Sequence, residues 1–267
     1  MSLRVYHPNM KGQRRSRAWL ARLAWLTTLM AIGAQIAYPL LDGEPLRLLT
    51  IATVVIAATA VTLQGWSTLG FRYATIYFSV TALFAWGIET LGVTTGWPFG
   101  EYSYATTLGP DIAGVPLVVP LAWVMMSHPI LVAARRLSMR WAAFIGGFGL
   151  MAWDIFLDPM MVEAGHWTWK QTQPALWGVP GIPLSNFAGW LLSGIILMSI
   201  LHALLPSERR SPPEGTAHTE IFLIWVYFSS VIGSIFFFDR PSVALVGGII
   251  MGIVVLPFAI SIWWSRL

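Results

Sequence analysis

The chain has 267 residues, of which 56% are hydrophobic and only 10% are charged, and its mean hydropathy is +0.67. A water-exposed surface needs more polar residues than this. The composition therefore excludes a soluble globular protein and predicts an all-α, polytopic integral membrane helix bundle. The chain has no cysteine, which excludes disulfides, thiolate metal sites and a cysteine nucleophile.

Eight apolar runs are long enough to cross roughly 30 Å of hydrocarbon, which takes about 20 residues of helix. They lie at 19–41, 46–65, 72–92, 115–134, 139–157, 183–205, 219–238 and 242–264. If both termini are cytoplasmic, only Arg47, Lys170 and Arg240 of the 16 Lys and Arg residues fall on outer segments. This bias predicts a multi-pass protein of the cell membrane with cytoplasmic N- and C-termini. The basic pI near 9.7 then reflects orientation in the membrane, and no nucleic-acid partner is expected.

We interpret residues 1–267 as a single transmembrane domain. A basic tail at 1–18 and a polar linker at 206–218 are expected on the cytoplasmic side. The first two helices have few ionisable groups, which favours a lipid-facing scaffold. The last two carry no chemical signal, and the neighbours Asp239 and Arg240 between them are expected to form an interfacial ion pair.

The third helix carries Glu89 about one turn inside its outer end. A carboxylate at that depth is costly unless it is protonated, paired or beside water, so it indicates a functional site. The segment 93–114 that follows is rich in Gly, Pro and aromatic residues, and a second such segment occupies 158–182. We expect both to fold as caps on the outer face.

The region around Glu89 is repeated around Asp154. When Glu89 is placed on Asp154, Gly100-Glu101-Tyr102-Ser103-Tyr104 meets Gly165-His166-Trp167-Thr168-Trp169 without a gap. After two inserted residues, Gly114-Val115-Pro116-Leu117 meets Gly181-Ile182-Pro183-Leu184, and Trp123 meets Trp190. Helices three and four are therefore predicted to be a parallel internal repeat of helices five and six, with a shared site where the copies meet. Two carboxylates that approach each other there would favour retention of a proton by one of them.

The second copy holds most of the polar candidates. Asp154 and Asp158 share a helix face at i,i+4 spacing, and Pro159 is expected to end that helix or open its last turn. Glu163 and His166 belong to the second cap, where either a loop hydrogen bond or a role in the site is open. Asn186, beside Ser185 in the first turn of helix six, is suited to hold water or orient a carboxylate.

Aromatic residues surround these carboxylates, and the pocket they predict is formed by Trp153, Trp167, Trp169, Tyr102, Tyr104 and Trp190. Such a pocket suits protonation of an alkene, because aromatic faces stabilise a carbocation and a second carboxylate or an amide positions water. It also suits a proton-coupled transporter of an apolar metabolite. The histidine spacing argues against a di-iron enzyme, and neither a metal nor a cofactor is expected.

The motifs Trp153-Asp154-x-x-x-Asp158-Pro159, Gly165-His166-Trp167-Thr168-Trp169, Gly181-Ile182-Pro183-Leu184-Ser185-Asn186-Phe187-x-Gly189-Trp190 and Gly100-Glu101-Tyr102-Ser103-Tyr104 resemble those of the carotenoid biosynthesis membrane family, which includes the CruF-type carotenoid hydratases. The resemblance covers roughly residues 70–200. It implies cofactor-independent addition of water to the terminal C1–C2 double bond of an acyclic ψ-end, in substrates similar to lycopene, γ-carotene or C50 precursors of bacterioruberin. The carotenoid would be taken from the bilayer lipid, and the resemblance leaves room for association with other carotenoid enzymes.

The repeat also resembles that of the small membrane lycopene cyclases, in which an acidic pair follows a similar Pro-Leu. Ser185 and Asn186 stand at that place in this chain, which argues against a cyclase and leaves polar groups that could hold water. We expect Asp154 to be the proton donor, with Glu89 and Asp158 tuning it or accepting a proton from water.

Overall fold

The computed structural model of the chain describes residues 18–206 and 217–264. The predicted basic tail, except residue 18, and most of the predicted linker at 206–218 lie outside the described residues. The helices are α2 (Ala18–Ala37), α3 (Gly43–Leu69), α4 (Phe71–Thr95), α5 (Val118–Leu137), α6 (Ala142–Glu163), α7 (Leu184–Leu204), α8 (Ala217–Phe236) and α9 (Pro241–Trp264).

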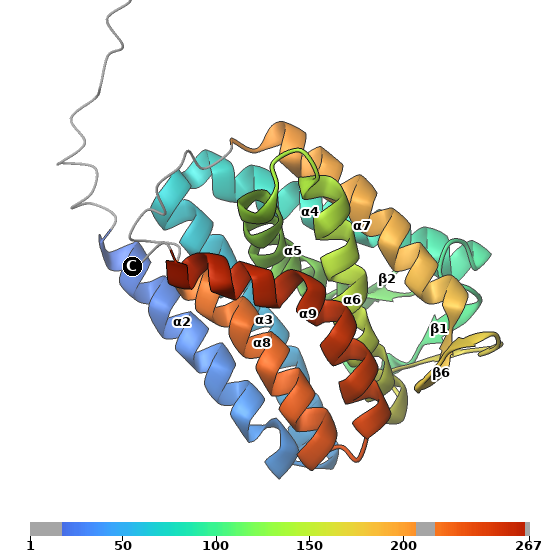
Figure 1. The fold of residues 1–267 in the computed structure, drawn as a ribbon. Helices are drawn as coiled ribbons and strands as arrows, with labels where there is room; N and C mark the ends of the chain where they lie inside the picture. Colours follow the sequence, from blue (N-terminus) through green and yellow to red (C-terminus); the bar gives the residue numbers. More distant parts are fainter. Residues whose placement is uncertain (1–17, 207–216, 265–267) are drawn as a thin grey trace, which may run out of the picture.

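In the described part of the chain, eight helices are long and apolar enough to cross a membrane. Each of them overlaps one predicted span, which confirms a multi-pass, all-α membrane protein. The helices α5 and α6 are the most enclosed and form the centre of the bundle (Figure 1). On the surrounding helices, large apolar side chains are exposed, as expected for faces that contact lipid.

The effect of one proline differs from the sequence prediction. The helix α6 was expected to end or open near Pro159, but it continues through this buried residue to Glu163. A proline has no N–H, so one helical hydrogen bond is lost, yet its φ is compatible with a helix and packing inside a membrane bundle tolerates the break. The helix α5 likewise continues through Pro129. The second cap therefore begins after Glu163 rather than at residue 158.

Two segments, one between α4 and α5 and the other between α6 and α7, form short strands and a 3-10 turn. Both lie at one end of the bundle, which we call the cap end (Figure 1). The first segment contains β1 (Tyr102–Tyr104), η2 (Thr106–Leu108), β2 (Asp111–Ile112) and β3 (Val115–Pro116). The second contains β4 (Trp167–Trp169), β5 (Ala175–Leu176) and β6 (Val179–Pro183). A further 3-10 turn, η1 (Tyr38–Leu40), follows α2.

The predicted repeat units contact each other through equivalent residues. Strand β1 pairs antiparallel with β4, with Ser103 opposite its equivalent Thr168. On either side the partners are exchanged, so that Tyr102 lies opposite Trp169 and Tyr104 opposite Trp167. Such an exchange is what a local two-fold axis through the Ser103–Thr168 pair produces. The equivalents Trp123 and Trp190 also stack, with ring centroids 4.2 Å apart and planes 8° from parallel.

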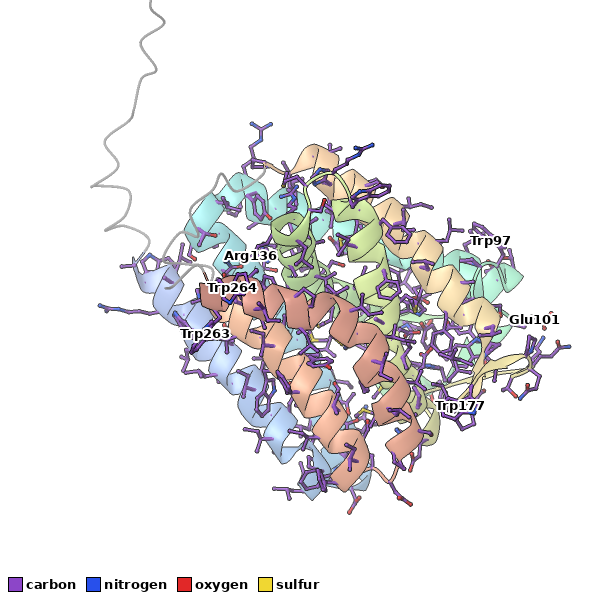
Figure 2. All side chains as sticks on the ribbon, viewed as in Figure 1. Trp97, Glu101, Arg136, Trp177, Trp263 and Trp264 are labelled. Carbon is purple, nitrogen blue, oxygen red and sulfur yellow. The ribbon has the colours of Figure 1, made fainter. Side chains whose placement is uncertain are left out.

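Exposed tryptophans mark both ends of the bundle. Figure 2 shows Trp97 and Trp177 at the cap end and Trp263 and Trp264 at the other end, near Arg136. All four tryptophans are more than half exposed. Tryptophan is enriched where a membrane protein crosses the interface between lipid and water, so these residues indicate the two membrane boundaries.

Candidate active site

A cavity of about 680 Å³ lies under the β1–β4 strands at the cap end. We call it the cap cavity. Both repeat copies contribute polar and aromatic walls, which are Glu89, Phe99, Tyr102, Tyr104 and Trp123 from the first copy and Asp158, Trp167, Trp169, Asn186 and Trp190 from the second. The rest of its lining is almost wholly apolar. The cavity is therefore a small apolar chamber into which two carboxyl groups project.

Glu89 is buried, with 4% of its surface exposed, and receives three hydrogen bonds. Its Oε2 accepts the hydroxyl protons of Tyr102 at 2.5 Å and Tyr104 at 2.8 Å, and its Oε1 accepts the indole N–H of Trp123 at 3.0 Å. Close packing supports this geometry, because a Cβ on Gly92 would lie 2.7 Å from the Tyr102 hydroxyl. Three donors aimed at one carboxyl group stabilise negative charge on it.

The hydroxyl groups of Tyr102 and Tyr104 remain donors over the whole accessible pH range. Burial raises the pKa of both phenols well above the usual value near 10, and the neighbouring Glu89 raises them further. The first cap thus supplies two fixed donors to Glu89.

The second carboxyl group in the cavity, Asp158, belongs to a buried pair. The amide nitrogen of Asn186 donates to Asp154 Oδ2 at 2.8 Å and to Asp158 Oδ2 at 2.5 Å. The indole of Trp167 donates to Asp158 Oδ1 at 3.0 Å. The two carboxyl groups thus lie around one amide donor. Two buried carboxyl groups in such an arrangement disfavour a second negative charge, which favours retention of a proton by one of them.

Asp154, the donor expected from the sequence, does not line the cap cavity. It is fully buried behind Asp158 and Asn186. Its Oδ1 has no hydrogen-bond partner in the described part of the chain. The i,i+4 spacing correctly placed the two aspartates together, whereas the one that faces the cavity is Asp158.

Aromatic rings form the walls around these groups. The ring centroids of Tyr102 and Trp169 lie 5.8 Å apart, and those of Tyr104 and Trp167 lie 5.6 Å apart in an edge-on arrangement. Each ring therefore packs against its partner on the opposite strand. The indole of Trp169 donates to the carbonyl oxygen of Phe99. Five of the six predicted aromatic residues line the cavity. Trp153 does not, although it meets Trp190 edge-on at 6.1 Å.

Besides Asp154, two more of the predicted polar residues lie outside the cavity. Glu163 is at the exposed end of α6 and forms an ion pair with Arg240, which replaces the expected pair of Arg240 with Asp239. The extension of α6 beyond Pro159 brings Glu163 within reach of that guanidinium.

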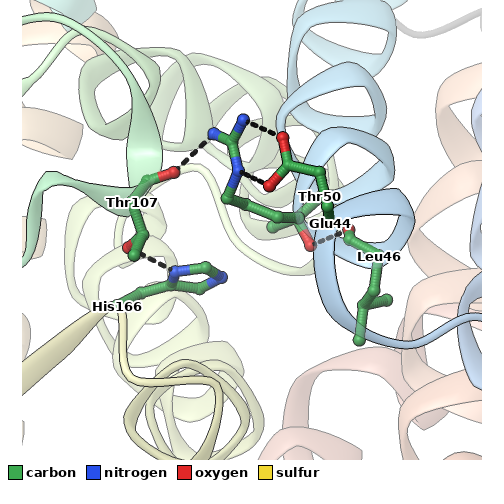
Figure 3. A network of polar contacts seen from close by, with 6 residues as sticks. Glu44, Leu46, Thr50, Thr107 and His166 are labelled. Atoms are coloured by element: carbon green, nitrogen blue, oxygen red, sulfur yellow. Dashed lines mark hydrogen bonds and ion pairs between the residues drawn. The ribbon is translucent and has the colours of Figure 1, made fainter.

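His166 is part of a polar network that ties both caps to α3 (Figure 3). Its Nδ1 lies 2.8 Å from the hydroxyl of Thr107, whose carbonyl oxygen accepts a 2.6 Å hydrogen bond from Arg47. The same guanidinium is paired with Glu44. Of the two roles left open for His166, the structure shows the loop hydrogen bond.

Sequence reasoning missed several cavity residues. Trp123 was visible as the repeat equivalent of Trp190 and could have been found from that alignment. Thr50 and Val54 line the cavity from α3, a helix interpreted from its bland composition as lipid-facing scaffold. That interpretation was wrong for this face of α3, because apolar cavity walls and lipid-facing surfaces have the same composition.

Comparison with known proteins found a family and a relative that match this chain. The family model described as "Carotenoid biosynthesis protein" matches residues 49–257. The chain is also 33% identical over 132 residues to a bisanhydrobacterioruberin hydratase from Haloarcula japonica. That alignment covers 47% of this chain and 43% of the relative, so it spans less than half of either protein. No solved structure shows a significant match. The family match includes every residue that lines the cap cavity, and the chain belongs to the carotenoid biosynthesis protein family.

Proposed function

We propose that this protein is a carotenoid hydratase, which adds water across the terminal C1–C2 double bond of an acyclic ψ-end. The observation that carries the proposal is that Glu89 and Asp158 line one aromatic cavity and have different hydrogen-bond partners. Family membership and the similarity to a hydratase support the same reaction class.

In the proposed mechanism, the proton held by the Asp154–Asp158 pair is transferred through Asp158, the member that faces the cavity. It adds to C2 of the alkene, and the electron pair of the double bond forms the new C–H bond. The positive charge that remains is on C1, a tertiary centre. General acid catalysis of this kind contributes roughly 10²–10⁴-fold to a rate.

The cavity walls would then stabilise the cation. Indole and phenol rings attract a positive charge through their faces, and Glu89, with its three donors, supplies a fixed negative charge. Because apolar walls exclude bulk water, this attraction is stronger than it would be in solution.

Capture of the cation by water completes the reaction. A water molecule held near Glu89 or Asn186 would attack C1 through its oxygen while Glu89 takes the released proton. The product carries a tertiary 1-hydroxyl group, and net addition is one water molecule. Return of the proton from Glu89 to the aspartate pair restores the starting state, and no redox step or cofactor is needed.

A cyclase would share the first protonation but would let an internal alkene capture the cation. The amide of Asn186, which contacts both aspartates, stands where the cyclase pattern has an acidic residue. This substitution favours water as the nucleophile.

Pigment analysis of a lycopene-producing bacterial host that expresses the chain tests the proposal. We expect a more polar pigment, heavier by one or two waters, with an unshortened chromophore. A cyclised product of unchanged mass would show a cyclase instead. If lycopene, γ-carotene and C50 precursors all stay unchanged while the protein is in the membrane, the hydratase proposal fails and a proton-coupled carrier becomes the better account.

A further inference from the structure

A second and larger cavity, about 1290 Å³, lies beside the cap cavity among α2, α3, α5, α6 and α8. We call it the lateral cavity. Its walls are mostly apolar and include Met125, Trp153, Met160, Trp225 and Phe228. The mechanism above uses none of these residues. A cavity with such walls suits an apolar occupant.

The two cavities adjoin. Thr50 and Val54 of α3 and Leu157 and Met161 of α6 line both of them. These four shared residues form a boundary between the cap cavity and the lateral one. An elongated molecule whose end lies beside Asp158 can therefore continue past Leu157 and Met161 into the lateral cavity.

The lateral cavity also reaches the outside of the bundle. Ile36 of α2 and Phe228 and Ile232 of α8 line it, and they are 55%, 46% and 48% exposed. The helices α2 and α8 run side by side (Figure 1). They are linked within the cavity wall by a 2.7 Å hydrogen bond from the Trp225 indole to Gln35 Oε1. Because these exposed side chains are apolar and belong to helices long enough to span a membrane, we infer that this opening faces lipid rather than water.

We propose that the lateral cavity is the binding site for the polyene chain of the substrate, which enters from the bilayer between α2 and α8. This inference rests on the proposed function. A carotenoid polyene is rigid, apolar and about as long as the bilayer core is thick, roughly 30 Å. It cannot fold into the cap cavity, so only its ψ-end fits there. The lateral cavity continues from the cap cavity, has aromatic and thioether walls and opens to lipid, as a polyene requires.

The test measures binding of lycopene to the purified chain in phospholipid nanodiscs, through the visible circular dichroism that an achiral polyene acquires in a protein site. Ser230 lines the lateral cavity from α8, whereas Ile235 of the same helix does not line it and is 45% exposed. We expect Ser230→Trp to weaken lycopene binding by about tenfold or more and Ile235→Trp to bind as the unmodified chain does. Thr53→Phe, which fills the cavity from α3, provides an independent variant should Ser230→Trp fail to fold.

The binding signal separates this inference from the proposed reaction. Asp158→Asn should bind lycopene normally even though it is expected to lose turnover. Saturable binding that the cavity variants weaken supports the polyene site, even if no carotenoid is hydrated. Equal binding by folded Ser230→Trp, Thr53→Phe and Ile235→Trp variants would overturn it. Absence of any saturable signal in the unmodified chain, as expected if phospholipid chains occupy the cavity, would overturn it too.

Discussion

Glu89 and Asp158 face the same cavity, but the hydrogen bonds around them suit opposite tasks. Glu89 accepts from two phenols and an indole, an arrangement that stabilises a carboxylate. Asp158 shares the Asn186 amide with Asp154, an arrangement that favours retention of a proton by one of the two carboxyl groups. In the proposed mechanism, one repeat copy thus supplies the base and the other the acid, although the copies share one sequence pattern.

Replacement of Asp158 by Asn keeps the shape of the side chain and removes its proton. We expect hydration to fall by about 100-fold or more, the usual size of a general acid contribution. Asp42→Asn, at an exposed position before α3, is the matched control and should keep full activity. Turnover of both purified variants, at equal protein in the membrane, is the measurement, and an active Asp158→Asn enzyme would exclude Asp158 as donor.

Replacement of Asn186 by Leu leaves two buried carboxyl groups without their shared donor. A buried polar group without a partner costs about 1–3 kcal/mol, so both thermal stability and hydration should decrease. Asn186→Gln, which retains the amide, should recover part of the stability. Thermal unfolding of the two variants in one detergent checks this, and an Asn186→Leu protein as stable as the unmodified chain would show that the amide does not hold the pair.

At the scale of elements, α6 and α7 approach through glycine. A Cβ on Gly194 would lie 2.9 Å from the Cα of Gly147, so the two backbones are in direct contact. Small residues allow such close helix packing in membranes. Because α6 carries both aspartates and α7 carries Asn186, this contact sets the distance between acid and amide.

Gly147→Val should therefore force the two helices apart, with a loss of stability of about 1–3 kcal/mol as for other overpacked positions. Gly87→Val is the control, because nothing lies within 4 Å of a Cβ at that exposed position of α4. Unfolding temperatures of both variants test the contact. Equal unfolding temperatures for the two variants would mean that the α6–α7 interface accommodates the larger side chain without a loss of stability.

The cap network should make the caps sensitive to acid. Burial lowers the pKa of His166, and the positive charge of Arg47 lowers it further. The unfolded chain then binds a proton more readily than the folded one. The contribution of His166 to stability is therefore present above about pH 6.5, the ordinary histidine value, and is lost as the pH falls below it.

Hydrogen exchange measures this effect at Ala105, whose amide donates to the His166 carbonyl oxygen at 2.8 Å. After correction for intrinsic exchange rates, protection should decline on acidification below about pH 6.5. His166→Gln should flatten that decline. A decline that persists unchanged in the variant would place the acid sensitivity elsewhere in the cap.

Hydropathy predicted the eight helices well because crossing lipid imposes length and composition on every span. It misplaced the end of α6, since proline rules for soluble helices are relaxed where a bundle encloses the helix. The repeat correctly placed Tyr102, Tyr104, Trp167 and Trp169 at the junction of the copies. It did not predict which aspartate faces the cavity, because that depends on helix rotation. The contribution of α3 to the cap cavity could not be predicted from the sequence, because Val and Thr occur both in cavity walls and on lipid-facing surfaces.

At the scale of the whole molecule, the two cavities are adjacent. Their common boundary is formed by Thr50, Val54, Leu157 and Met161. One holds carboxyl groups and aromatic rings, and the other opens to lipid between α2 and α8. A hydrocarbon substrate in the bilayer can thus reach Asp158 without leaving an apolar environment. This arrangement suits a substrate whose reactive end is a small part of a long hydrocarbon.

The source of the new hydroxyl oxygen atom distinguishes hydration from oxidation. Purified protein in nanodiscs is incubated with lycopene in ¹⁸O-labelled water under strict anaerobiosis, and the product is examined by mass spectrometry. We expect a hydroxylated carotenoid that carries the heavy isotope and forms without dioxygen. A product that forms only in air, or whose hydroxyl oxygen comes from dioxygen, would contradict proton-initiated hydration and show an oxidative enzyme.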